Sequence, residues 1–288
     1  MIKKKTNKLC PVCQNELKFW IEKKRRAIFK CSHCNHICVP AGQLKDENNS
    51  SIYERDKPIF ENDDKIDYYL DETNLLSAKK KKELVKNYIK NGADLLDIGS
   101  NYGHFLFSIK DVFNGVGLEI SPSAVNWSQH NFDVKTFIGS AENIPPEIQK
   151  EFKVITMWDV IEHLENPNKA LDEVYNHLEN DGYFFLSTPD SSSWIARLLG
   201  RRWYHLDPEQ HINLFSKKNL KKILKEKSFK IVKVSTIGHI YRLNYIKKKI
   251  FGSGGSKNIK KNLLYKMGKI KIYIKLFDVA LIIVKKNK

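Results

Sequence analysis

The chain has 288 residues, enough for one sizeable hydrophobic core and a small additional unit. Hydrophobic residues make up 41% and charged residues 29%, as in globular proteins, and no uncharged apolar stretch is long enough to suggest a transmembrane helix. The basic start, Met1 to Lys5, runs directly into cysteines without an apolar segment. We therefore predict no secretory signal and expect a cytoplasmic protein.

The formal net charge is +17, which raises the question of an anionic partner. Clustered basic side chains attract phosphates and anionic surfaces, so RNA or a membrane surface could be bound. However, 43 of the 50 basic residues are Lys and only seven are Arg. We favour a solvated Lys surface and keep an anionic partner as the alternative.

All five cysteines lie near the N-terminus, the last of them being Cys38, and four of them form two C-x2-C pairs separated by 17 residues. This spacing is typical of a four-cysteine zinc site, in which each pair forms a tight turn and four thiolates surround the metal. The zinc ligands are predicted to be Cys10, Cys13, Cys31 and Cys34. The strand-like runs 17–21 and 27–30 fit a hairpin between the pairs.

Two disulfides are the alternative for these cysteines, but a cytoplasmic chain favours metal. A closed four-cysteine site is structural and needs no further ligand, so His33, His36 and Cys38 are predicted to lie at the surface or behind the ligands. We expect a zinc ribbon over residues 1–42 and, because residues 43–66 are polar without regular periodicity, a linker after it.

Residues 67–288 alternate short apolar runs with amphipathic stretches, which predicts an α/β domain with a mostly parallel sheet. We expect seven strands, at 94–98, 115–120, 134–138, 152–158, 182–188, 229–236 and 276–285. Helices are expected at 122–131, 168–179 and 216–227.

A glycine-containing turn follows the first of these strands, at residues 97–103. Gly99 and Gly103 would let the backbone approach a ligand at a helix N-terminus. The next strand ends in Glu119, where an acidic group can bind ribose hydroxyls. The alternative, which we disfavour, is that Glu119 is only a surface charge.

With these features the chain resembles class I S-adenosylmethionine-dependent methyltransferases, whose Rossmann-like sheet has seven strands and helices on both faces. Their loop commonly reads D-x-G-x-G-x-G, and here Asn101 replaces the middle glycine. The resemblance implies that the loop holds the methionyl part of the cofactor and that Glu119 holds the ribose. Residues 138–145 resemble the segment that frames the adenine, and residues 152–164 resemble the fourth strand and its turn. The cofactor residues implied are Asp97, Gly99, Ser100, Asn101, Gly103, Glu119, Ile120, Ser140, Ala141, Glu142, Trp158, Asp159 and His163.

The turn after the fourth strand also resembles that of ubiquinone-pathway O-methyltransferases, which is associated with a divalent metal. Asp159, Glu162 and His163 are therefore possible ligands of such a metal. The alternative, which we favour, is that Glu162 and His163 cap and pack a helix.

Residues 203–216 resemble a segment of methyltransferases that often accompany sugar, polyketide and surface-glycan pathways. Methyl transfer to oxygen requires removal of the acceptor's proton, for which His is suited. We expect His211 to be the general base, with His205 as second candidate and with Tyr204 and Glu209 orienting the acceptor. Either histidine could instead only cap and pack a helix.

Residues 237–275 form an expected insertion before the last strand, with basic residues alternating with bulky apolar ones and a flexible break at 252–256. The segment could be a lid over a phosphorylated or lipid-linked acceptor, a surface helix at anionic lipid, or an ordinary solvated helix pair.

The leading functional hypothesis is methyl transfer to a small-molecule or glycan acceptor, such as a nucleotide sugar or lipid-linked saccharide, in surface polysaccharide biosynthesis. An RNA methyltransferase is the alternative, because zinc ribbons and basic surfaces recur there. Pyrimidine C5 methylation is excluded, since it generally needs a Cys nucleophile and no Cys follows Cys38. Base N-methylation by an N/D-P-P-Y/F turn is disfavoured by the sequence after residue 157. A non-enzymatic binding protein with a degenerate methyltransferase fold is the third hypothesis. The sequence predicts no particular oligomeric state.

Overall fold

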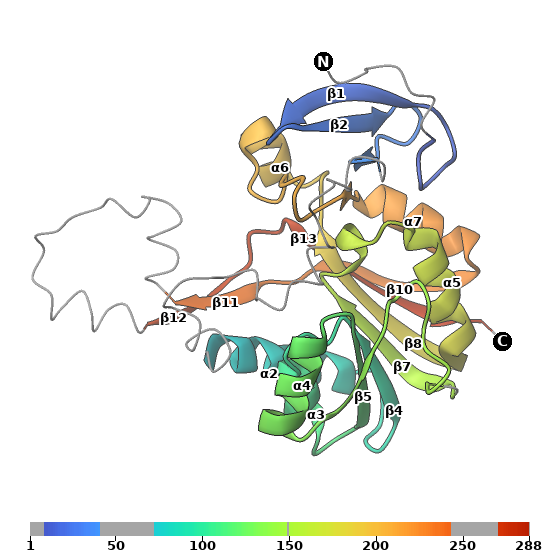
Figure 1. Cartoon of the computed structure of the whole chain (residues 1–288), viewed down its shortest axis with the longest axis vertical. Helices are drawn as coiled ribbons and strands as arrows, with labels where there is room; N and C mark the ends of the chain where they lie inside the picture. The colour runs from blue at the N-terminus through green and yellow to red at the C-terminus, as the bar shows by residue number, and fades with distance from the viewer. Residues whose placement is uncertain (1–8, 41–71, 149, 243–269, 288) are drawn as a thin grey trace, which may run out of the picture.

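The structure is a computed structural model, and it describes residues 9–40, 72–148, 150–242 and 270–287 (Figure 1). The expected linker, residues 43–66, and residues 243–269 of the expected insertion lie outside the described residues. Among the described helices, none combines the length and the apolar character needed to cross a bilayer.

A seven-stranded sheet forms the centre of the larger domain, as the sequence predicts (Figure 1). Its strand order is β10-β13-β8-β7-β4-β5-β6, and β13 is antiparallel to both of its neighbours while the other strands are paired in parallel. The strands are β4 (Asp94–Ile98), β5 (Asn114–Glu119), β6 (Lys135–Ile138), β7 (Phe152–Trp158), β8 (Leu178–Pro189), β10 (Phe229–Thr236) and β13 (Val279–Lys286).

Helices cover both faces of the sheet. Successive residues of a strand point to opposite faces, and in these strands the residues on both faces are apolar and buried. In β4, Leu96 packs in the core beneath α5 (Pro167–His177) and α7 (Lys217–Glu226). Its neighbour Leu95 packs in a second core, with α2 (Glu72–Lys86) and α3 (His104–Ile109). α4 (Pro122–Phe132) lies beside α3, where Phe132 stacks on Phe107. The near-continuous apolar character of these strands thus follows from burial on both faces.

Three helix starts are fixed by side-chain caps that the sequence provides. Ser121, Asn166 and Ser216 each accept a hydrogen bond from the backbone N–H three residues further on. Such caps satisfy one of the N–H groups that an α-helix leaves without an internal partner. The observed helices accordingly begin within one residue of the expected positions.

The N-terminal ribbon does not stand apart from the larger domain. Its strands β1 (Leu17–Lys23), β2 (Arg26–Cys31) and β3 (Ile37–Cys38) form an antiparallel sheet whose fourth strand is β9 (Asn213–Leu214), from the larger domain. The β1–β2 hairpin was predicted, whereas the pairing of β3 with β9 was not. The backbone N–H of Val39 extends it by donating to the carbonyl of Ile212 at 2.8 Å.

A buried histidine reinforces this junction. The Nε2 of His36 donates to Oδ1 of Asn213 at 3.0 Å, and Nδ2 of Asn213 donates to the carbonyl of Leu164 at 2.7 Å. Burial lowers the pKa of His36 to about 4, so its ring is neutral at physiological pH. Ile37 and Val39 share a hydrophobic cluster with Trp203 and Leu206 of the larger domain.

Two smaller features complete the described fold. After β8 the chain forms α6 (Trp194–Leu199) and the 3-10 turn η3 (Gly200–Arg202), which lie against the ribbon hairpin (Figure 1). At the two ends of the expected insertion, β11 (His239–Arg242) pairs with β12 (Lys271–Ile274) in an antiparallel hairpin.

Replacing Asn213 by Ala should destabilise the protein, because the variant leaves the buried Nε2–H of His36 and the carbonyl of Leu164 without their partner. The expected loss in the free energy of unfolding is about 1–3 kcal/mol. It can be measured by urea denaturation, with the exposed Asn131→Ala as control, since the side chain of Asn131 donates to the carbonyl of Trp127 in its own helix. Equal unfolding midpoints for the two variants would contradict the proposed importance of this junction.

Candidate functional site

The turn after β4 has the backbone geometry of a ligand cradle. Gly99, Asn101 and Gly103 all have positive φ, at 72°, 48° and 76°. A Cβ atom added to Gly99 would lie 2.3 Å from Cγ2 of Val160, so this position requires glycine. Asn101 adopts the left-handed conformation that its residue type tolerates, and its Oδ1 accepts from the N–H of Tyr102 at 2.8 Å. The missing middle glycine therefore leaves the turn intact.

Glu119 closes the next strand and faces this turn. Its Oε2 accepts from the backbone N–H of Asn101 at 2.8 Å, and its Oε1 accepts from that of Ser121 at 2.9 Å. Burial raises the pKa of Glu119, while these backbone hydrogen bonds oppose the rise. Ile120, the next residue, is 42% exposed and offers an apolar edge beside the carboxylate.

Beneath the turn, a buried carboxylate and a lysine lie close together. Asp97 accepts from Oγ1 of Thr156 at 2.6 Å, and burial raises its pKa to about 7, against the effects of Thr156 and Lys81. Lys81 reaches in from α2, with its Nζ 4.9 Å from the ring centre of Trp158. Burial lowers the pKa of Lys81, and the nearby Asp159 and Asp97 oppose this. Sequence reasoning missed Lys81, because it sits in a run of four lysines that nothing distinguishes.

Trp158 and Asp159 end β7 at the same edge of the sheet. The Nε1 of Trp158 is buried and has no hydrogen-bond partner among the described residues. Asp159 has a φ of 58°, and its Oδ1 accepts from Oγ of Ser187 at 2.9 Å. Burial alone would raise the pKa of Asp159, but His239, 3.8 Å from its Oδ2, and Lys81 hold it below the ordinary value.

The segment expected to frame the adenine forms a further wall. The Oγ of Ser140 accepts from the N–H of Glu142 at 3.1 Å, and Oε1 of Glu142 accepts from the N–H of Asn166 at 3.0 Å. Ala141 is buried between them. The buried Oγ of Ser100 and Nε1 of Trp158 both have no partner among the described residues, which fits a polar ligand in the glycine cradle. These residues fit S-adenosylmethionine, whose methionyl, ribose and adenine groups need polar, acidic and apolar neighbours.

A buried carboxylate organises the expected acceptor side. Asp278 lies just before β13, and its Oδ2 accepts a hydrogen bond from the hydroxyl of Tyr204. The same oxygen accepts from Nε1 of Trp203 at 3.4 Å. The Nε2 of His205 lies 3.9 Å from the same oxygen. Burial and Asp278 raise the pKa of Tyr204, so its hydroxyl remains protonated. Sequence reasoning missed Asp278, whose only signal was an acidic residue at the start of an apolar strand.

His211 and His163 lie close to each other, with ring centres 5.0 Å apart. Nδ1 of His211 lies 2.7 Å from the carbonyl of His205, and Nδ1 of His163 lies 2.6 Å from that of Gln210. Glu162, in the 3-10 turn η2 (Ile161–His163), accepts from Oγ1 of Thr188 at 2.8 Å. The ligand atoms of Glu162, His163 and His211 lie within 4.8 Å of one another.

Two predicted side chains have other neighbours. Asp159, one of the expected ligands of a divalent metal, bonds to Ser187 and lies near His239, and it is not part of the group around His211. Glu209, expected to orient the acceptor, is exposed and forms a 2.8 Å ion pair with Lys24 of the ribbon hairpin.

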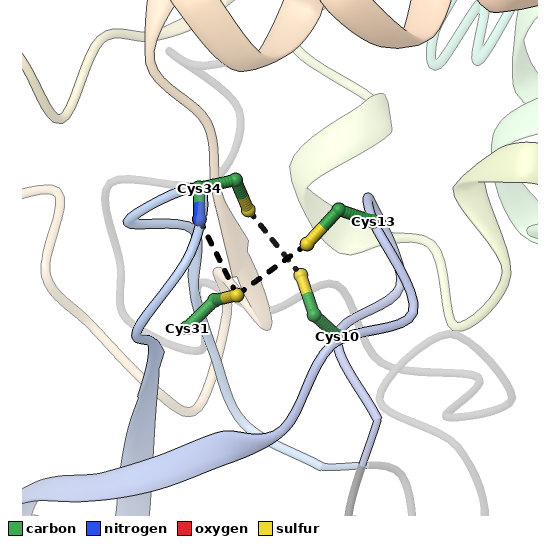
Figure 2. Close-up of side chains that lie close together, drawn as sticks. All are labelled: Cys10, Cys13, Cys31 and Cys34. Carbon is green, nitrogen blue, oxygen red and sulfur yellow. Dashed lines mark hydrogen bonds between the residues drawn. The ribbon is translucent and has the colours of Figure 1, made fainter.

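The four expected zinc ligands converge at one end of the ribbon (Figure 2). The sulfurs of Cys10 and Cys34 are 3.5 Å apart, and those of Cys13 and Cys31 are 3.4 Å apart. These separations exceed the about 2.05 Å of a disulfide and approach the roughly 3.8 Å edge of a tetrahedron with Zn–S bonds of about 2.3 Å. Backbone N–H groups of Val12 and Cys34 donate to the sulfurs of Cys10 and Cys31, as is typical around thiolates. The residues therefore fit a structural zinc ion.

Comparisons with known proteins agree with this geometry. The sheet and the cradle at its edge define the class I S-adenosylmethionine-dependent methyltransferase fold. Residues 66–234 match the model of a family described as a methyltransferase domain, and the chain belongs to this family. An uncharacterized protein of Methanocaldococcus jannaschii is 26% identical over 174 residues, which are 60% of this chain and 80% of that protein.

Two solved structures illustrate the likeness of fold. A putative methyltransferase of Bacillus halodurans is 16% identical with a TM-score of 0.52, over 73% of this chain and 99% of the other. The magnesium protoporphyrin IX methyltransferase of Synechocystis, solved with bound S-adenosylhomocysteine, is 11% identical with a TM-score of 0.50, over 77% of this chain and 87% of the other.

Replacing Cys10 by Ser should abolish metal binding at the ribbon, because the variant removes one of four converging sulfurs. We expect about one zinc per wild-type chain by elemental analysis, and much less in the variant. Cys38→Ser is the matched control, since Cys38 lies in β3 outside the cluster and should leave the zinc content unchanged. Zinc-free wild-type protein that unfolds at the same temperature as zinc-loaded protein would contradict a structural zinc site.

Replacing Glu119 by Ala should weaken S-adenosylmethionine binding by about 10–100-fold, because hydrogen bonds to a charged group contribute about 1.5–3 kcal/mol. Isothermal titration calorimetry measures the change. Glu147→Ala, at an exposed position of the same charge, should bind like wild type. Wild-type affinity in Glu119→Ala would rule out Glu119 as the ribose ligand.

Proposed function

We propose that the protein transfers the methyl group of S-adenosylmethionine to a hydroxyl of a small-molecule or glycan acceptor, such as a nucleotide sugar or lipid-linked saccharide in surface polysaccharide biosynthesis. The observation that carries this proposal is a group of four polar side chains, Tyr204, His205, His211 and Asp278. The first three lie between β8 and β9, and Asp278 lies just before β13. Hydroxyl acceptors need such hydrogen-bonding groups and a base, and do not need a Cys nucleophile.

On the cofactor side, each residue has a role suited to its position. The turn from Asp97 to Gly103 would hold the methionyl group, and Glu119 with Ile120 would hold the ribose and one edge of the adenine. Ser140, Ala141 and Glu142 would frame the adenine. Trp158, Asp159 and His163 would line the pocket near the methyl group, where bound S-adenosylmethionine supplies an electrophilic carbon on a positively charged sulfur.

On the acceptor side, we assign the general base to the histidine pair, His211 first and His205 second. Because a carbonyl can only accept, the Nδ1 of His211 carries its proton and its Nε2 carries the lone pair in the neutral ring. Tyr204, held by Asp278, would orient the acceptor. Glu209 would help to orient the acceptor from the exposed edge of the acceptor site, where its ion pair with Lys24 fixes its position.

The distribution of arginine supports an anionic acceptor. Five of the seven arginines belong to the ribbon hairpin or to α6 and η3, namely Arg25, Arg26, Arg197, Arg201 and Arg202. The Nζ of Lys23, in the ribbon hairpin, donates to the carbonyl of Arg201 at 3.1 Å. The segments that carry the two groups of arginines are therefore adjacent. Arginine binds phosphate groups in a bidentate manner, which suits the diphosphate of a nucleotide sugar or lipid carrier.

We further propose residues 1–42 as a zinc-stabilised ribbon, 43–66 as a linker and 67–288 as the methyltransferase domain, with 237–275 inserted. The ribbon would act as a structural element that shapes the acceptor side, since β9 begins two residues after His211. The expected lid or lipid-facing segment within 243–269 lies outside the described residues.

Incubation with labelled S-adenosylmethionine and a panel of nucleotide sugars should yield a product heavier by one methyl group in mass spectrometry. His211→Asn should lower kcat by about 10²–10⁴-fold, because a positioned base contributes that much. Its affinity for S-adenosylmethionine should stay within about twofold, and His130→Asn, on the exposed face of α4, should be fully active. Methyl transfer to RNA with none to saccharides, or no transfer to either, would overturn the proposal.

A further inference from the structure

Helix α6 presents large apolar side chains to solvent. Leu198 is 75% exposed, the highest fraction of any large hydrophobic residue in the described part of the chain, and Trp194 is 59% exposed. The two residues are one helical turn apart, so they lie on the same side of α6. Leu199 adds a third exposed apolar side chain. Single exposed apolar residues are common, whereas several of them together mark an interaction surface.

This exposed side is not the side by which α6 packs on the protein. Ile195 and Ala196 are buried in a cluster with Ile28 of the ribbon hairpin and with Trp203. The helix lies beside the turn end of that hairpin (Figure 1). Its own core contacts are therefore already made, and the ribbon holds the helix with its other side outward.

Basic side chains accompany the exposed apolar ones. The sequence of α6 and η3 contains no acidic residue and three arginines, all exposed, namely Arg197, Arg201 and Arg202. The turn of the ribbon hairpin, residues 23–26, is entirely basic. It contacts η3, because Nζ of Lys23 donates to the carbonyl of Arg201.

The acidic residues of these segments do not cancel the positive charge. Residues 22–26 and 194–209 together contain seven basic and three acidic residues, a net charge of +4. Two of the acidic side chains, Asp207 and Glu209, are paired with Lys24. Lys24 and Arg25 have positive φ, at 50° and 60°, in a turn where Asn and Gly are favoured. The hairpin thus has basic residues where other residue types would cost less.

The combination of exposed Trp and Leu with arginines suits a bilayer surface. At such a surface Trp and Leu enter the headgroup region, while Arg side chains reach the lipid phosphates. The phosphates of RNA or of a free nucleotide would also bind the arginines. They would leave Leu198 in water, where its exposure costs free energy.

We propose that α6, η3 and the hairpin turn 23–26 form a docking surface for an anionic lipid bilayer. Trp194 and Leu198 insert among the headgroups, and the three arginines of α6 and η3 bind lipid phosphates. Docking needs no methyl transfer and so goes beyond the proposed function. Because residues 203–216 follow η3 directly, docking would bring the proposed acceptor side to the membrane, where a lipid-linked saccharide is anchored.

Binding can be measured by sedimenting the zinc-loaded full chain with vesicles of phosphatidylcholine alone or mixed equally with phosphatidylglycerol. We expect binding to the mixed vesicles that weakens at high salt. Arg201→Gln should weaken it about fivefold, since a basic residue near an anionic membrane contributes about 1 kcal/mol. Leu198→Ser should weaken it about tenfold or more, because the leucine no longer leaves water.

Matched controls come from β10, which also exposes an apolar and a basic residue. Val232→Ser, at a position 42% exposed, and Lys230→Gln should bind the mixed vesicles like wild type. Equal thermal unfolding midpoints for all four variants check that the fold is intact.

Insertion has its own spectroscopic signature. Brominated lipids quench the fluorescence of a tryptophan that enters the bilayer, and Trp194 is the most exposed tryptophan among the described residues. Wild type should be quenched by mixed vesicles that contain brominated lipid. Trp194→Phe should lose most of this quenching and keep binding within about threefold, since Phe is also a large apolar side chain.

Absence of binding to the mixed vesicles, or equal binding by Leu198→Ser and wild type, would overturn the docking proposal. So would RNA binding or self-association that depends on Leu198 and Arg201 while vesicles are not bound. Methyl transfer is assayed separately, without vesicles and with soluble nucleotide sugars. Failure of docking and failure of the proposed function are therefore distinguishable.

Discussion

The pairing of β3 with β9 is the contact on which the proposed acceptor side of this protein depends. It joins Ile37 and Cys38 of the ribbon to Leu214 and Asn213, which lie three and two residues beyond His211 in the chain. Most of segment 203–214 has no regular secondary structure of its own, so its conformation must be fixed by what it packs against. The ribbon sheet, the His36–Asn213 hydrogen bond and the Lys24 ion pairs provide that support.

The proposed cofactor side is supported by the parallel sheet of the α/β domain. Glu119 ends β5 and Asp159 follows β7, and these parallel strands of one sheet have their carboxyl ends at the same edge. Ligands of open α/β sheets bind at this edge, because loops there are positioned by rigid strands. The proposed donor and acceptor sites thus have two supports of different origin, one within the α/β domain and one shared with the ribbon.

Much of the fold and of the cofactor side could be predicted from sequence, because local signals determine them. Strands β4, β7 and β10 have the predicted bounds, since their apolar runs end at turn residues, and Gly99 and Gly103 have the positive φ that the loop motif implied. The four cysteines cluster as their spacing predicted. These features depend on neighbours within a short stretch of chain or on a fixed spacing.

Long-range contacts could not be predicted. The short strand β9 has no periodicity, and nothing in the sequence indicates that it completes the ribbon sheet. Lys81 and Asp278 reach the site from α2 and from the start of β13, which are far along the chain from Trp158 and Tyr204 respectively. The sequence grouped Glu162 and His163 with Asp159, whereas the folded chain brings in His211 from a later and distant segment.

Hydrogen exchange with and without the proposed zinc ion tests the central claim, that the ribbon holds the proposed acceptor segment, residues 203–214, in place. Stripping zinc should release β3 and strongly increase amide exchange in residues 203–214, while the cofactor turn and β5 remain protected. Unchanged protection of residues 203–214 in zinc-free protein would contradict this account.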